Sequence, residues 1–217
     1  MKERLLVQIA PLFPTFRLDS REGPLVREIL AGTQKLLVPF TDLDPNFRFS
    51  ILCAIRLDEV ENICNLFNRA PASYHSITLT SATPLEYFTD APPEFTFSTP
   101  DELQEAVAHL SMYSEDIAHF FKRYQDVRSL HEAMNSPEGH RFDDTINPAR
   151  AMRSITLARL VSYEEFKKIL PIQEAAVRHC REDDRKVFSD LVAYLERLPR
   201  TPSYSASSPG LATDRFE

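Results

Sequence analysis

The side chains most suited by type to catalysis lie in one polar loop, 136–144, which reads SPEGHRFDD. His140 titrates near neutral pH and could act as a general base beside Glu138, Asp143 or Asp144. No nucleophile and no oxyanion donor accompanies it, and solvated loops rich in Glu, His and Asp are common on protein surfaces. We therefore predict no catalytic residues, and keep an enzyme that uses this loop as an alternative.

Other residues that could serve metal or phosphate chemistry lack the necessary context. Glu165 and Lys167 match the ExK half of a nuclease metal motif, but they lie inside a helical pattern with Lys168 adjacent. Three histidines fall on predicted helices without i, i+4 spacing to one another, and these are His109, His119 and His131. The sequence therefore predicts no metal site.

Glycines and cysteines narrow the possible functions further. The chain has four glycines, whereas phosphate-binding loops need several close together so that backbone amides can approach the ligand. Neither HExxH nor GxSxG occurs. Cys53, Cys64 and Cys180 form no CxxC pair, and free thiols in apolar patterns usually pack as small hydrophobic groups. We therefore expect no cofactor. Free thiols suit a reducing compartment, so we expect the protein in the cytoplasm.

Charge is distributed unevenly along the chain. The net charge is −7, and residues 70–121 contain no Lys or Arg. Eight acids fall within that stretch: Glu86, Asp90, Glu94, Asp101, Glu102, Glu105, Glu115 and Asp116. Nucleic-acid binding needs a basic face, so we expect no nucleic-acid partner. A surface of one sign instead steers basic proteins toward it.

The candidate binding surface combines these acids with neighbouring aromatic residues. Three acids lie among prolines and are expected to be unpaired, and three more begin a predicted helix, with Phe95 nearby as an apolar anchor. We predict that a basic protein binds at Glu86, Tyr87, Phe88, Asp90, Glu94, Asp101, Glu102 and Glu105. In the alternative interpretation, the acids at the helix start serve only capping and solubility.

The elements expected to position this surface begin with a sheet. The run RFSILCAIRL (48–57) has apolar residues on both faces of an extended chain and therefore predicts a central strand. A helix is predicted to follow over 58–67. Alternating patterns predict strands at 76–81 and 94–98 and a short one at 16–18. Helical spacing predicts helices over 2–10 and 24–37.

The second half of the chain has helical patterns throughout. Thr99, Pro100 and Glu102 have capping-box spacing with proline at the first helical position, and predict a long helix that continues to Phe121. Apolar stripes predict four further helices, one of which contains Pro171. Residues 199–217 are rich in Ser and Pro and predict a flexible tail.

These patterns predict an α+β fold with a small mixed sheet covered by helices and a mostly helical C-terminal half. We expect a single domain over 1–198, with the sheet in 1–98 and the helical part in 99–198. No apolar run approaches the length of a membrane span, so no membrane partner is expected. The patterns do not predict an oligomeric state.

The order of these elements resembles that of bacterial immunity proteins, which protect a cell from a polymorphic toxin made by itself or its kin. The resemblance lies in 48–57, in 99–135 (TPDELQEAVAHLSMYSEDIAHFFKRYQDVRSLHEAMN) and in 155–170 (ITLARLVSYEEFKKIL). It implies a non-enzymatic protein that sequesters a toxin, often by plugging its active site, and gives no catalytic residues to carry over. A chaperone or adaptor for a secreted or multiprotein system, which would bind an unfolded or N-terminal segment, is the other alternative.

Overall fold

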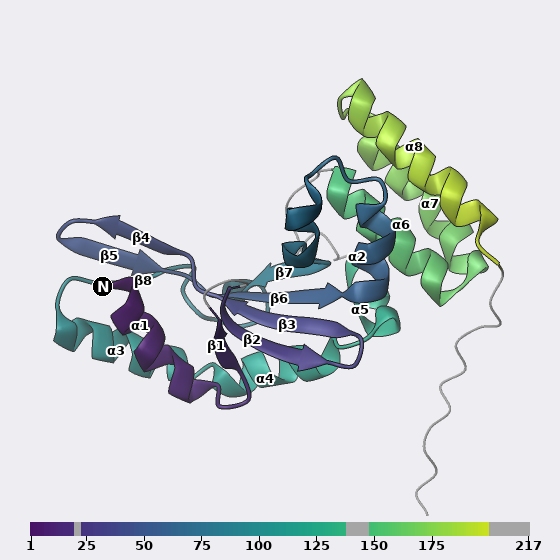
Figure 1. Cartoon of the computed structure of the whole chain (residues 1–217). Helices are drawn as coiled ribbons and strands as arrows, with labels where there is room; N and C mark the ends of the chain where they lie inside the picture. The colour runs from purple at the N-terminus through teal and green to yellow at the C-terminus, as the bar shows by residue number, and fades with distance from the viewer. Residues whose placement is uncertain (20–22, 138–147, 200–217) are drawn as a thin grey trace, which may run out of the picture.

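The strands form two antiparallel sheets in the computed structural model, which describes residues 1–19, 23–137 and 148–199 (Figure 1). The larger sheet has the order β1-β2-β3-β6-β7: Arg17–Asp19, Gly23–Ile29, Gly32–Leu37, Leu52–Leu57 and Ser81–Pro84. The smaller has the order β4-β5-β8: Phe40–Leu43, Asn46–Phe49 and Phe95–Phe97. The sheet predicted as one mixed sheet is therefore two antiparallel ones, because a single predicted strand contributes to both.

That strand, predicted over 48–57, is divided at Ser50 and Ile51 into β5 and β6. Strand β6 lies between β3 and β7 in the larger sheet, and five of its six residues are buried. The prediction that both faces of this strand are covered is confirmed. Strand β5 instead pairs with β4 and β8, so this one apolar run links the two sheets.

The helix predicted over 24–37 is wrong, because β2 and β3 form a hairpin there. Leu25 pairs with Leu36 across the hairpin, and both side chains are buried. Gly32 begins β3 at φ +151°, and a Cβ at this position would lie 2.1 Å from the carbonyl oxygen of Arg56. This close approach of two backbones requires glycine and favours the hairpin over a helix.

The strand predicted at 76–81 is also wrong, because the chain forms the 3-10 helix η2 (Ala72–Ile77) and enters the sheet only at β7. The guanidinium of Arg56 accounts for this difference. Its Nη1 donates to the carbonyls of His75 (2.9 Å) and Thr78 (3.1 Å) and to Thr78 Oγ1 (2.7 Å). These carbonyls are therefore bound to a side chain and do not pair with a strand.

Helices account for most of the remaining described residues. They are α1 (Lys2–Ile9), α2 (Asp58–Asn65), α3 (Pro100–Ser111), α4 (Ser114–Arg123), α5 (Val127–Met134), α6 (Pro148–Val161), α7 (Tyr163–Val177) and α8 (Glu182–Arg197), with the short 3-10 turns η1 (Ala10–Leu12) and η3 (Leu85–Tyr87). The helices predicted at 2–10 and after residue 57 are confirmed, and Pro171 lies inside α7. The long helix predicted from Thr99 to Phe121 is interrupted at Met112 and Tyr113, where the Ser114 hydroxyl donates to the carbonyl of Ser111.

The two sheets and the helices form the expected α+β arrangement. In Figure 1, β4, β5 and β8 lie at one end with α1 and α3, and α6, α7 and α8 gather at the other end. Buried apolar side chains from both ends belong to one continuous core cluster, and the second half is helical as predicted. No helix in the described ranges is long and apolar enough to cross a membrane. The tail beyond Pro199 and most of loop 136–144, including His140, lie outside the described residues.

Candidate functional site

Three of the predicted acids line one hollow beside β8 and the start of α3. The hollow has a volume of about 510 Å³ and is lined by Pro92, Glu94, Phe95, Thr96, Glu102, Glu105, Ala106 and His109. We call it the acidic hollow. Glu102, Glu105 and His109 share one side of α3, because residues three and four apart are neighbours on a helix surface. Glu94 reaches the same hollow from the chain that enters β8.

The N-terminus of α3 is fixed by the capping residues that the sequence predicts. The Thr99 hydroxyl accepts a hydrogen bond from the Glu102 amide at 3.2 Å. The Glu102 carboxylate accepts one in return from the Ser98 amide at 2.6 Å, one residue before the position a capping box would use. Glu102 therefore stabilises the start of α3, which is the capping role that the alternative interpretation gives to the acids there.

The other two acids of the hollow differ in their partners. Glu94 is paired with Arg48 of β5 at 3.2 Å, so the prediction that it is unpaired is wrong. Glu105 is exposed and makes no hydrogen bond or ion pair within the described residues. One guanidinium therefore faces three carboxylates, and the hollow keeps a net negative charge.

The remaining predicted binding residues do not line this hollow. Glu86 and Tyr87 lie in η3 and are half-buried, and Asp90 is exposed in the segment that follows. Phe88 stacks on Phe120 with ring centroids 4.6 Å apart and packs against the core. Asp101 is exposed in the first turn of α3. The structure brings together Glu94, Glu102 and Glu105, and leaves the other five outside the hollow.

Phe95 is not available as an apolar anchor. Its side chain is 4% exposed and stacks on Phe49 with ring centroids 5.0 Å apart. It forms the floor of the acidic hollow instead, where the His109 ring meets it edge-on at 5.5 Å. From the sequence, His109 is a candidate only for metal binding. It lies seven residues after Glu102, however, and this spacing places both side chains on one side of α3. No group of three His, Cys, Asp or Glu side chains in the described ranges could hold a metal ion.

A second hollow, of about 960 Å³, lies between α5 and α7 and contains a histidine–carboxylate pair. His131 Nε2 lies 3.2 Å from Glu165 Oε2, and Nδ1 lies 2.9 Å from Asn135 Nδ2. Burial lowers the pKa of His131. Both ring nitrogens are engaged within the protein, so neither is free to take a proton from a substrate.

The ExK triplet that contains Glu165 does not form a metal and phosphate site. Phe166 is fully buried, and the Lys167 ammonium lies 5.1 Å from the centre of the Tyr163 ring. Lys168 is the lysine that approaches Glu165, at 3.5 Å. The three residues of the triplet are therefore divided among a helix surface, the core and the second hollow.

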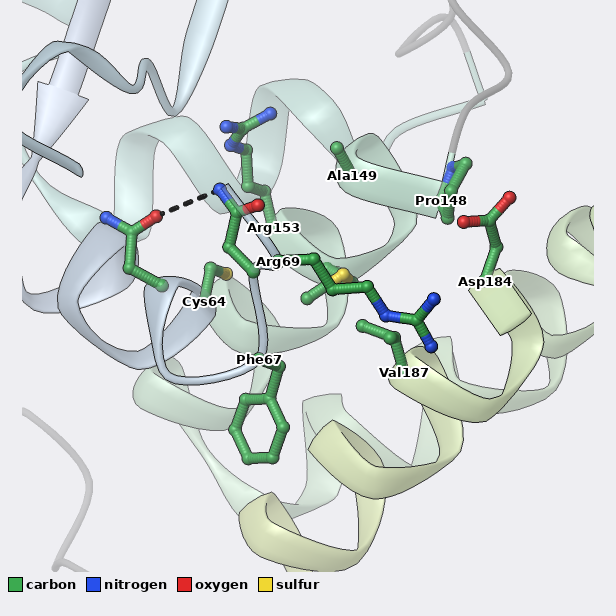
Figure 2. A pocket seen from close by; sticks show the side chains of 11 residues that line it. Cys64, Phe67, Arg69, Pro148, Ala149, Arg153, Asp184 and Val187 are labelled. Carbon is green, nitrogen blue, oxygen red and sulfur yellow. Dashed lines mark hydrogen bonds between the residues drawn. The ribbon is translucent and has the colours of Figure 1, made fainter. Parts of the chain in front are cut away.

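A third, smaller pocket of about 190 Å³ lies between α2, α6 and α8, and Figure 2 shows eight of its lining residues by name. Cys64 lies at its wall, and burial raises the pKa of this thiol to about 12, so it stays protonated at neutral pH. The Arg69 side chain extends across the pocket in Figure 2 and pairs with Asp183 at 3.1 Å. Arg153 is bound to Glu61, whose side chain is 0% exposed, at 2.8 Å. The pocket therefore presents no reactive group.

Comparison with known proteins gives no match to a family model, to a curated protein or to a solved structure. Of these three hollows, the acidic hollow is the one that brings together several of the residues predicted to bind a basic protein, and its net charge is negative.

Proposed function

We propose that this chain is a non-enzymatic binding protein that receives a basic protein partner at the acidic hollow. The observation that supports it best is the meeting of Glu94, Glu102 and Glu105, which come from two separate elements, around one hollow. Surfaces of one sign attract partners of the opposite sign and accelerate their encounter. A Lys or Arg side chain entering the hollow would meet Glu105, which makes no hydrogen bond or ion pair in the part of the chain that the structure describes.

The partner we propose is a toxin domain, and the chain would act as an immunity protein in the cytoplasm. The sequence resemblance supports this role, and three free cysteines suit a reducing compartment. Toxins that act on nucleic acid carry Lys and Arg on their substrate face, because phosphate binding depends on positive charge. An acidic hollow seated on such a face would cover it and block access of the substrate.

Capture from the native cell tests this proposal. The bait is the full chain, compared with Glu94→Lys/Glu105→Lys, and both preparations are probed for partners by mass spectrometry. Glu196 is exposed on α8, far along the chain from the hollow, so Glu196→Lys is a control for charge reversal on the surface. We expect a basic protein to be captured by the wild type and by the control, and much less by the double variant.

Co-expression then separates an immunity protein from a chaperone or adaptor. Production of the captured protein alone should arrest growth of a neutral host, and co-production of this chain should restore it. A captured protein that is harmless, or that binds through an unfolded segment, would contradict the immunity role and leave the chaperone alternative.

A further inference from the structure

The hollow between α5 and α7 contains a hydrogen-bonded junction of three helices. From α5, His131 meets Glu165 of α7 at 3.2 Å. Asn135, just after α5, uses its Nδ2 to reach both His131 Nδ1 (2.9 Å) and the carbonyl of Ser154 in α6 (3.1 Å). Gln173 of α7 donates to Asn135 Oδ1 at 3.5 Å. One imidazole and one amide therefore connect α5, α6 and α7.

The Ser154 carbonyl determines the direction of every bond in this junction. A backbone carbonyl only accepts, so the atom of Asn135 that faces it must be the amide nitrogen. The same nitrogen faces His131 Nδ1, which must then be the acceptor. The imidazole proton is therefore on Nε2 and is donated to the Glu165 carboxylate. The junction fits the neutral form of His131 and uses both of its nitrogens.

We propose that this junction is a proton-operated latch, in which protonation of His131 at Nδ1 releases α5 from α6 and α7. The added proton would set an N–H of the imidazolium against an N–H of Asn135. Rotation of the Asn135 amide does not relieve this conflict, because it would turn Oδ1 toward the Ser154 carbonyl and Nδ2 toward the Gln173 donor. Protonation therefore costs at least one hydrogen bond of the junction.

Burial and the charges around His131 determine the pH at which the latch operates. The side chain is 6% exposed, and this burial is the largest influence on its pKa and lowers it. Glu165 of α7 and Glu132 of α5 raise the pKa, and Lys168 of α7 lowers it. Arg128 of α5 also lines the hollow, and α6 contributes the uncharged Ser154 carbonyl. Because burial outweighs the acids, the pKa of His131 lies below the ordinary value of a histidine, and the release occurs on the acid side of neutral pH.

Nuclear magnetic resonance on histidine-labelled full-length protein tests the latch. The Cε1–H signal of His131 is assigned by its absence in His131→Gln, and its midpoint is followed together with the amide protection factors of α5. We expect a midpoint below the ordinary value of about 6.5 and a drop of protection in α5 as the pH falls through it. Helix α4, which does not contribute to the junction, provides the internal comparison for protection.

Asn135→Asp should make the junction favour the protonated form of His131, because a carboxylate accepts a hydrogen bond from Nδ1–H. In this variant the His131 midpoint should rise above that of the wild type, and acid should no longer loosen α5. A wild-type midpoint at or above about 6.5, or unchanged protection of α5 across the midpoint, would overturn the latch. The wild-type titration decides the question even where Asn135→Asp fails to fold.

Discussion

Replacement of Arg159 by methionine should loosen the C-terminal helix α8 and destabilise the whole protein. Arg159 is 3% exposed on α6, and its guanidinium donates to three carbonyls at the end of α8. Nε binds Leu195 O at 2.9 Å, and Nη2 binds Leu198 O at 2.5 Å and Pro199 O at 3.0 Å. Leu195 O belongs to the last turn of α8 and also accepts from the Leu198 amide, and the other two carbonyls lie just beyond the helix, so this one side chain fixes the chain where α8 ends.

The magnitude follows from the burial of each acceptor. A hydrogen bond to a charged group contributes roughly 1.5–3 kcal/mol, and Leu195 is fully buried, so its bond counts in full. Leu198 and Pro199 are more exposed, and water can replace the arginine there at smaller cost. Methionine keeps most of the apolar stem. We therefore expect a loss of about 2–4 kcal/mol in the free energy of unfolding, or a fall of about 5–12 °C in Tm for a chain of this size.

Urea and thermal unfolding, followed by circular dichroism, measure this loss. Arg197→Met is the matched control, because Arg197 lies at the same helix end, is exposed, and makes one bond to the carbonyl of Ala193. The control should stay within about 0.5 kcal/mol of the wild type. Arg159→Met as stable as the wild type, or equal losses in both variants, would contradict this role of Arg159.

Three further predictions concern stability and thiol chemistry. Gly32→Ala should destabilise the protein by about 3 kcal/mol or more in urea unfolding, because its Cβ would meet the Arg56 carbonyl at 2.1 Å and strain the backbone; a loss below about 1 kcal/mol would contradict this. Cys64 should resist alkylation in the native protein at pH 7 and react only after unfolding, which mass spectrometry of labelled peptides can check. The lowered pKa of His131 means that the native state binds fewer protons than the unfolded state, so its contribution is fully present above about pH 6.5 and is lost as the pH falls through the native pKa. Unfolding of His131→Gln should show a weaker pH dependence in that window.

Features of the fold that depend only on neighbouring residues could be predicted from the sequence. Thr99, Pro100 and Glu102 specify a helix start without help from distant residues, and the structure has α3 beginning there. The apolar residues of 24–37 fit a helix and a hairpin equally well. The choice depends on Gly32 lying against the Arg56 backbone, a contact between residues far apart in sequence.

In the candidate site, too, contacts between residues far apart in sequence could not be predicted. Helical spacing could have joined His109 to Glu102 and Glu105, since all three are on α3. No local pattern indicates that Arg48, 46 positions away, neutralises Glu94. The alternation of Phe95 and Phe97 correctly predicts a strand with both rings on one face, but it does not show that Phe95 packs on Phe49 and is closed to a partner.

If the acidic hollow steers a basic partner, its charge sets the rate at which the captured partner associates. Stopped-flow measurements at about 0.02 M and 0.5 M salt would compare the wild type, Glu105→Lys and Glu196→Lys, since Glu105 has no partner to lose among the described residues. We predict that Glu105→Lys slows association by about tenfold at low salt, that Glu196→Lys changes it little, and that the three rates converge at high salt. Equal slowing by both reversals, or a Glu105→Lys rate unchanged at low salt, would contradict the claim.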